Sequence, residues 1–299
     1  MRDPNPMRWI EAAKAGGYAV GGFNMHNDET TQALLQAAEK ADAPIYLQVG
    51  RAIIPHMGVK KAYELTVRNA EESDALYSIH LDHGTWDEVL LAVRLGFDSI
   101  MFDAAHLPFE DNIKITRRVV ELCHDYGIPV EAELGKIPDV GAKVEWASYY
   151  TDVDEAERFV AETGVDLLAI SAGVVHGVIP GLEQEPLAIE LVQKIRDVVP
   201  VPLVLHGISG VPDREVKDAI ANGVCKLNGD TDLRHAFRAG LEQEWAKGDR
   251  QLEEVLDAGR VRMIEATVQK FEVFGSAGKA GQLTGPTGTL ADIATGAPR

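Results

Sequence analysis

The chain has 299 residues, and its 29 Lys and Arg against 47 Asp and Glu give a net charge of −18. Such an acidic chain repels nucleic-acid phosphates and anionic membranes, so neither is expected as a partner. A composition of 45% hydrophobic and 25% charged residues is typical of a globular protein and excludes collagen-like repeats and extensive disorder.

Cysteine usage and the N-terminal sequence indicate a cytoplasmic protein. The two cysteines, Cys123 and Cys225, form no disulfide framework and fit a reducing compartment. The first residues lack the apolar region of a signal peptide. The most apolar stretch, residues 165–179, is shorter than a membrane span and contains Asp166 and His176.

Short apolar runs bounded by Gly, Pro, Asp or Asn predict strands along the whole chain. In chain order they are residues 18–24, 44–49, 75–81, 98–102, 128–134, 166–172, 201–206 and 224–228. Helix-period segments lie between them, most clearly at 111–126 and 186–199. Strands that are apolar on both faces and alternate with helices indicate a parallel sheet. Eight such units in roughly 250 residues predict a single (β/α)8 TIM barrel rather than an open doubly wound sheet.

After the last strand, the sequence predicts a C-terminal helical extension of the barrel. A helical stretch covers residues 260–274 and is followed by a Gly-, Thr-, Ala- and Pro-rich segment without periodicity. We therefore expect one domain over residues 1–280 and a flexible tail over residues 281–299.

Polar residues gather at the carboxyl ends of the predicted strands, where TIM barrels hold their active sites. His83, His176 and His206 follow strands three, six and seven, and each precedes a glycine. Three imidazoles with an open fourth position form a catalytic zinc site. Asp82 directly precedes His83 and is placed to shuttle a proton. The carboxylates that end strands four and five, and that can orient ligands or hold a second cation, are Asp103 and Glu133.

The other histidines do not share this context, and we assign them structural roles. They are His26, His56, His80, His106, His124 and His235.

A phosphate cradle is predicted after strands seven and eight. The turn Gly207-Ile-Ser209-Gly210 leads into a helix at Pro212, so its backbone N–H groups and a hydroxyl can bind an anion. Residues 228–231 open the last barrel helix with N-cap chemistry. Zinc beside a phosphate favours polarisation of a carbonyl next to a phosphate ester, as in retro-aldol cleavage of a phosphorylated ketose.

Seven phrases, in order through about residues 8–280, resemble the class II, zinc-dependent ketose-bisphosphate aldolases, such as the fructose- and tagatose-bisphosphate enzymes. They are IHLDHG from residue 79, SIMFDAAHLPFEDNI from 99, VEAELG from 130, GVVHG from 173, LVLHGISG from 203, GVCKLNGDTDLRHAF from 223 and FGSAGKA from 274.

The resemblance implies a role for each matching residue. It implies zinc ligands at His83, His176 and His206, a catalytic acid/base at Asp82, and a second cation, or the zinc in another position, at Asp103 and Glu133. Positions matching those that hold dihydroxyacetone phosphate are Gly177, Gly207, Ser209, Asn228, Asp230 and Thr231, with Asn24 near its polar end. It further implies a monovalent cation near the phosphate, a homodimer or homotetramer, and a role in carbohydrate metabolism such as glycolysis.

Two departures from the family pattern concern the other half of the substrate. After EAELG the family's glutamate-bearing loop is replaced by residues 136–146, where Asp139 or Glu145 is the candidate base. At the mouth after strand two stands Arg51, which can pair with a phosphate, carboxylate or sulfonate on the aldehyde half. An exposed or subunit-interface role for Arg51 is equally compatible with the sequence.

The sequence thus predicts an aldolase that reversibly cleaves a ketose phosphate similar to fructose or tagatose 1,6-bisphosphate. The alternatives are an aldolase with a different aldehyde partner and a catalytically weakened sugar-phosphate-binding relative. A Schiff-base mechanism through Lys226 or Lys136 leaves the three histidines without a purpose. A metal-dependent hydrolase on the same fold lacks its expected His-x-His pair.

Overall fold

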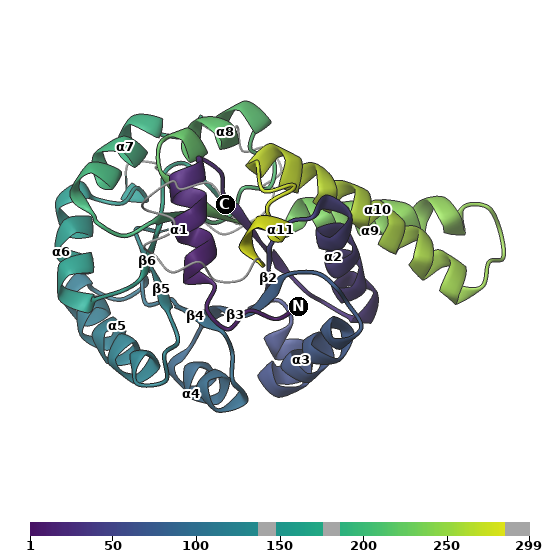
Figure 1. The fold of residues 1–299 in the computed structure, drawn as a ribbon, viewed down its shortest axis with the longest axis horizontal. Coiled ribbons are helices and arrows are strands. Elements are labelled where there is room, and N and C mark those ends of the chain that lie inside the picture. Colours follow the sequence, from purple (N-terminus) through teal and green to yellow (C-terminus); the bar gives the residue numbers. More distant parts are fainter. Residues whose placement is uncertain (137–147, 176–185, 285–299) are drawn as a thin grey trace, which may run out of the picture.

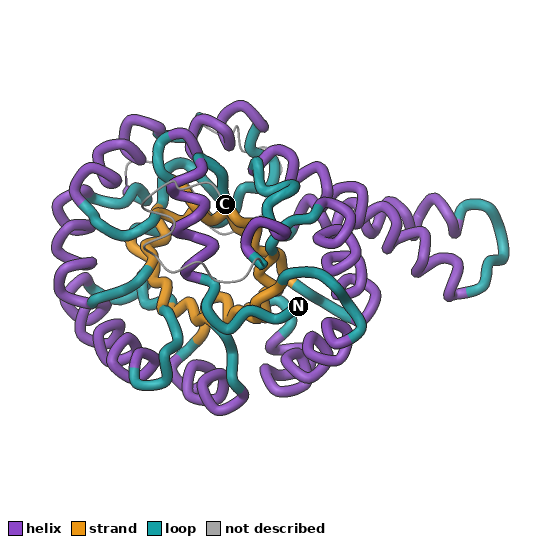
Figure 2. Tube along the Cα trace, in the orientation of Figure 1, coloured by secondary structure: helices purple, strands orange, loops and turns teal. Residues whose placement is uncertain are grey.

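The computed structural model describes residues 1–136, 148–175 and 186–284. Within these ranges, eight parallel strands close into one barrel in chain order, with β1 paired to both β2 and β8. Helices surround the strands as an outer ring (Figure 2). The strands are β1 Val20–Asn24, β2 Ile45–Gly50, β3 Tyr77–Gly84, β4 Ser99–Phe102, β5 Val130–Leu134, β6 Leu167–Ile170, β7 Leu203–Leu205 and β8 Val224–Gly229. The predicted (β/α)8 barrel is confirmed, strand by strand.

The helices follow the strands as the sequence pattern predicts, and α9 and α10 project beyond the ring (Figure 1). They are α1 Met7–Gly16, α2 Asp28–Ala41, α3 Ile54–Glu71, α4 Trp86–Leu95, α5 Phe109–His124, α6 Val153–Thr163, α7 Ile189–Val198, α8 Asp213–Ala221, α9 Thr231–Trp245, α10 Leu252–Phe274 and α11 Ala280–Leu283. Local capping sets several starts: Thr85 and Glu88 form a capping box at α4. Helix α10 begins eight residues before the predicted stretch at 260.

One local expectation is wrong. Helix α9 begins at Thr231 as predicted, but the side chain of its N-cap residue Asp230 makes no capping hydrogen bond. Its carboxylate instead contacts His26 Nε2 at 2.7 Å and accepts from Arg234 Nε at 2.8 Å. The carboxylate therefore binds side chains at the mouth of the barrel instead of capping the helix.

Helix α1 covers the amino-terminal end of the barrel and lies across the ring of strands (Figure 1). Trp9 and Ile10 are fully buried there, and the Trp9 ring meets Tyr46 of β2 edge-on with centroids 5.5 Å apart. Trp9 Nε1 donates a hydrogen bond to Asp3 Oδ2 at 2.6 Å, which satisfies its buried polar group. The floor of the barrel is thereby packed with side chains.

The barrel interior above this floor is polar as well as apolar. Buried hydrogen bonds or close contacts join Lys226 of β8 to Glu131 of β5 and to His80 of β3. Because these strands are not neighbours in the sheet, the contacts must span the interior. Most of the apolar core lies instead between the strands and the helices.

The chain beyond α10 continues as ordered structure past the predicted domain boundary at residue 280. Backbone N–H groups of Gly278 and Ala280 donate to the carbonyls of Ala41 and Asp42, each at 2.8 Å, and so tie α11 to the end of α2. Residues 285–299 of the expected tail lie outside the described residues. None of the helices in the described part of the chain is both long and apolar enough to cross a membrane.

Both thiols are buried, which disfavours the reactive thiolate form. Burial raises the pKa of Cys123 to about 12 and that of Cys225 to about 11, and neither forms a disulfide. Since the thiolate is the reactive species, we expect neither cysteine to react with Ellman's reagent at pH 8 in the native state and both to react in urea. Rapid labelling of either thiol in the folded protein would contradict this burial.

Candidate active site

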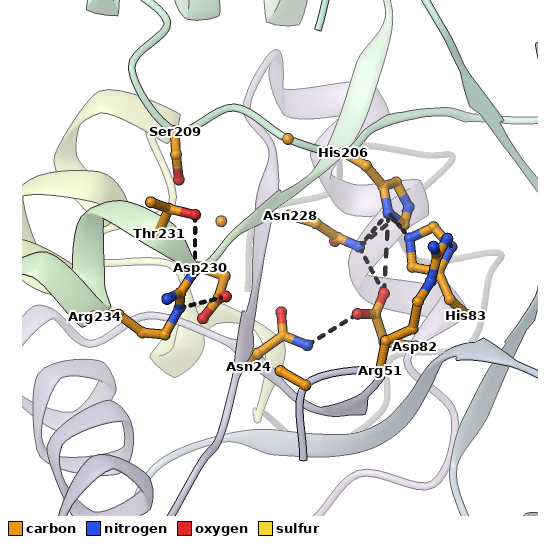
Figure 3. A pocket seen from close by; sticks show the side chains of 13 residues that line it. Asn24, Arg51, Asp82, His83, His206, Ser209, Asn228, Asp230, Thr231 and Arg234 are labelled. Carbon is orange, nitrogen blue, oxygen red and sulfur yellow. Dashed lines mark hydrogen bonds and ion pairs between the residues drawn. The ribbon is translucent and has the colours of Figure 1, made fainter. Parts of the chain in front are cut away.

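A cavity of about 290 Å³ lies at the carboxyl ends of the strands (Figure 3). It brings together most of the sequence-predicted site residues from β1, β3 and β8, the segments that follow β2 and β7, and the start of α9. Those lining it are Asn24, Arg51, Asp82, His83, His206, Gly207, Ser209, Asn228, Asp230 and Thr231. Four others, His176, Gly177, Asp139 and Glu145, lie outside the described residues, so their predicted roles stay predictions.

His83 is held by an irregular stretch of backbone at the end of β3. The register between β3 and β4 shifts between Leu81 and Gly84, and His83 has a positive φ of 52°. A left-handed non-glycine residue is uncommon and is often found where a side chain must be aimed. Here the imidazole is aimed so that Nδ1 lies 2.8 Å from Asp103 Oδ2 and Nε2 lies 3.0 Å from His206 Nδ1.

The second imidazole is held in the same way from its far side. His206 Nε2 lies 2.7 Å from Glu131 Oε1. Each ring thus has one nitrogen on a carboxylate. The other nitrogen faces the other ring (Figure 3). This is the arrangement in which carboxylates orient metal-binding histidines.

The donor set fits a divalent metal. Two nitrogens bound to one tetrahedral zinc ion lie about 3.3 Å apart, close to the distance between His83 Nε2 and His206 Nδ1. Ligand atoms of Asp82, His83 and His206 all lie within 4.8 Å of one another, as do those of His83, Asp103 and Glu133. The first cluster, with two imidazoles and one carboxylate, suits zinc. The second cluster, with one imidazole and two carboxylates, offers more oxygen ligands and suits a harder cation.

Asp82 is buried between the two imidazoles and the β1 side of the mouth. Its Oδ2 accepts a hydrogen bond from Asn24 Nδ2 at 2.9 Å, and Oδ1 lies 3.9 Å from His206 Nδ1. A side chain at Gly50 would place Cβ within 2.6 Å of Asp82 Oδ2, so glycine makes room for this carboxylate. Burial opposes ionisation, but the charges of His83 and His206 outweigh it and lower the pKa of Asp82 to about 2.

The pKa values of the two carboxylates predicted to hold a second cation are shifted in opposite directions. Burial raises the pKa of Glu133 to about 8, and its Oε2 has no hydrogen-bond partner among the described residues. Burial also opposes ionisation of Asp103, but the hydrogen bond from His83 holds the pKa of Asp103 well below its usual range. A buried, unsatisfied carboxylate oxygen is what an absent cation or proton would satisfy.

The opposite side of the cavity is a cradle formed by the loop after β7 and the start of α9. Gly207 has φ 63°, and a Cβ there would lie 2.3 Å from the carbonyl oxygen of Val175. The same loop lies beside the start of α9, where Ser209 Oγ accepts from Asp232 N at 3.3 Å. Backbone N–H groups at a helix start favour an anion.

Arg51 stands between the metal-ligand candidates and solvent, with its side chain 51% exposed. One guanidinium nitrogen lies 2.6 Å from Asp103 Oδ2 and 2.7 Å from His83 Nδ1. A neighbouring hollow of about 450 Å³, lined in part by Arg51, Pro55, Glu88 and Asp103, opens on its other side. The guanidinium therefore faces both spaces.

Sequence reasoning missed one residue of the cavity wall and several contacts around it. Arg234 lines the cavity and lies one helical turn after Asp230, so the i,i+4 spacing on the predicted helix was the available signal. His26 and His80, assigned structural roles, contact Asp230 and Lys226 respectively. Lys226 itself is 1% exposed and paired with Glu131, so it is poorly placed for a Schiff base with a substrate in the cavity.

Comparisons with known proteins agree with this geometry. The family model described as "Fructose-bisphosphate aldolase class-II" matches residues 5–279. The fructose-bisphosphate aldolase of Streptococcus pneumoniae is 38% identical over 289 residues, covering 91% of this chain and 98% of that protein. That of Thermus caldophilus is 35% identical, covering 91% and 97%. The crystal structure of the YdjI aldolase from Escherichia coli K12 superposes with a TM-score of 0.84 at 34% identity, covering 94% of this chain and all of that one.

The cradle predicts a contrast between two glycines of similar backbone conformation. Gly207→Ala should destabilise the protein by about 2–4 kcal/mol, because strain at positive φ adds to the clash with Val175. Gly17→Ala, at φ 65° with nothing within 4 Å of a Cβ, should cost only about 1 kcal/mol. Urea unfolding measures both, and equal losses would show that the Val175 contact does not constrain the loop.

Proposed function

The chain belongs to the class II fructose-bisphosphate aldolase family, a family of metal-dependent aldehyde-lyases, and from this premise we propose that it reversibly cleaves a ketose phosphate to dihydroxyacetone phosphate and an aldehyde. One observation carries the proposal: the cavity holds the imidazole pair and Asp82 on one wall and an anion cradle on the other. The substrate resembles fructose or tagatose 1,6-bisphosphate in carrying a phosphate beside its carbonyl.

The metal would be zinc, held by His83 and His206 together with His176, and a second divalent or a monovalent cation would use Asp103 and Glu133. When bound, zinc supplies a Lewis acid for the substrate's carbonyl oxygen and for the enediolate oxygens. The protein's own contribution is to fix both imidazoles through the carboxylates of Asp103 and Glu131.

Asp82 would move the proton of the hydroxyl next to the bond that breaks. In the cleavage direction its ionised carboxylate accepts that proton, the carbon–carbon bond breaks to leave an aldehyde, and the electron pair becomes the enediolate of dihydroxyacetone phosphate. Asn24 holds one carboxylate oxygen and so orients the other toward the cavity. Asp139 or Glu145 would return a proton to the enediolate carbon.

The phosphate of the dihydroxyacetone half would sit in the cradle. Gly207, Ser209 and Thr231 offer backbone N–H groups and hydroxyls, and Asn228 adds an amide on the inner side. Asp230 would face a substrate hydroxyl, while Arg234 places a positive charge at this wall of the cavity. Gly177 would complete the binding of this half.

A second candidate is an aldolase with an aldehyde other than glyceraldehyde 3-phosphate. The observation that favours it is Arg51, whose guanidinium lies beside the imidazoles at the opening toward the second hollow. An anionic group at the far end of the aldehyde half would replace Asp103 as the partner of this guanidinium. If no ketose phosphate is cleaved, the protein would be a catalytically weakened relative that only binds sugar phosphates.

We further propose a single domain over residues 1–280 and assembly as a homodimer or homotetramer.

The substrate is tested by release of dihydroxyacetone phosphate from a panel of ketose 1-phosphates with phosphate, carboxylate or neutral far ends. We expect turnover that is lost after dialysis against a chelator and restored by zinc. Strong cleavage of fructose or tagatose bisphosphate would remove the case for an unusual aldehyde. Activity that resists chelation, with borohydride trapping at Lys226 or Lys136, would overturn the metal mechanism.

Asp82→Asn should lower kcat by roughly 10²–10⁴-fold, because the amide cannot accept the hydroxyl proton. Zinc content should stay at the wild-type level, since the imidazole pair keeps its partners Asp103 and Glu131. Steady-state kinetics and metal analysis of the same preparation measure the two effects. Unaltered turnover would refute the acid/base role of Asp82.

Arg51→Gln should raise KM by about tenfold or more for substrates with an anionic far end, because a charge-assisted hydrogen bond is lost. KM for neutral-ended substrates should change little. Arg234→Gln is the matched control: it lies at the cradle and should raise KM for both substrate types. An equal effect of Arg51→Gln on both types would assign Arg51 no part in selecting the aldehyde.

A further inference from the structure

A chain of buried contacts runs through the barrel interior, and the proton transfers proposed above do not use it. His206 Nε2 lies 2.7 Å from Glu131 Oε1, and Glu131 Oε2 accepts from Lys226 Nζ at 2.7 Å. Lys226 Nζ lies 3.4 Å from His80 Nε2, and His80 Nδ1 lies 2.7 Å from Ser99 Oγ. All five side chains are at most 4% exposed. They come from β3, β4, β5, β8 and the residue after β7.

Stability alone does not explain this chain of contacts. Lys226 and Glu131 are each 1% exposed, and removing two charges from water is expensive even when they pair. Apolar residues of similar volume in place of a buried ion pair are often neutral or stabilising. The surrounding layer already contains large side chains such as Tyr46, whose ring lies 5.3 Å from Lys226 Nζ.

The contacts do determine which nitrogen of His206 faces the cavity. The amide of Asn228 lies 3.2 Å from Nδ1 and 3.1 Å from Nε2, so it does not distinguish the two. Glu131 contacts Nε2 alone and leaves Nδ1 on the side of His83. Lys226 in turn holds the other oxygen of Glu131, so the carboxylate cannot rotate away without leaving a buried ammonium unpaired.

We propose that Glu131, anchored by Lys226, is a positioning residue that fixes the ring orientation of His206 and so presents Nδ1 for metal binding. The proposal rests on the proposed function only in assigning His206 to the metal. It makes the ion pair part of the metal site, although neither charged group faces the cavity. His80 and Ser99 form the far end of the chain and should matter less, because they reach His206 only through Lys226.

Metal binding without substrate tests this role separately from catalysis. The metal-free double variant Glu131→Leu/Lys226→Met should unfold at a temperature near that of the metal-free wild type, since both charges leave together. Its affinity for zinc, measured by competition with a chromophoric chelator, should fall about 10–100-fold. The visible absorption of the cobalt-substituted protein should change in position and intensity.

Two further variants separate positioning from packing. Glu131→Gln keeps an oxygen that can accept from His206 Nε2, so it should restore much of the affinity lost in the double variant. Tyr46→Phe removes a buried hydroxyl in the same layer without touching the chain of contacts, and it should leave zinc affinity and the cobalt spectrum unchanged.

The outcomes distinguish this inference from the proposed function. Wild-type zinc affinity and cobalt spectrum in the double variant, or in the alternative apolar pair Glu131→Met/Lys226→Leu should the first pair not fold, would overturn the positioning role. Equal losses in Tyr46→Phe would do the same, by showing a packing effect. A wild-type protein that binds no zinc would instead refute the metal site itself.

Discussion

The site depends on two imidazole nitrogens, on His83 and His206, that face each other at 3.0 Å inside a closed barrel. Two such rings keep this orientation only if their other nitrogens are held, because an imidazole can otherwise rotate to seek a different partner. Asp103 holds one ring and Glu131 the other. The irregular end of β3 and the polar barrel interior both support this juxtaposition, and Gly50 makes room beside it for the carboxylate of Asp82.

The barrel also reconciles an acidic protein with the anionic substrate proposed for it. The net charge of −18 is spread over the whole chain, whereas the mouth concentrates hydrogen-bond donors and two arginines, Arg51 and Arg234. Local groups dominate because solvent and salt screen distant surface charges, while donors at the cavity wall act at contact distance. The net charge of the whole chain therefore argues against nucleic acids and anionic membranes as partners, but it does not predict which ligand binds in the cavity.

Much of the fold was predictable because buried parallel strands are short apolar runs bounded by turn residues, and all eight were found. Closure of a parallel barrel places every carboxyl end on one face, so Asp82, His83 and His206 were expected to meet. The sequence did not predict how deep in the barrel interior each inward-facing side chain lies. Glu131 and Glu133 alternate on one strand and both face inward, yet only the stagger of β5 against β8 decides that Glu131 meets Lys226. The contact between His80 and Lys226 was not predictable for the same reason.

Helix α1 closes the amino-terminal end of the barrel by packing Trp9 against Tyr46. This closure bears on how reaction products would leave the cavity. In the proposed cleavage, a cavity closed at its base would give both fragments of the sugar the same exit. The fragment held in the cradle would then leave after the fragment nearer to solvent, so the architecture of the barrel would order product release.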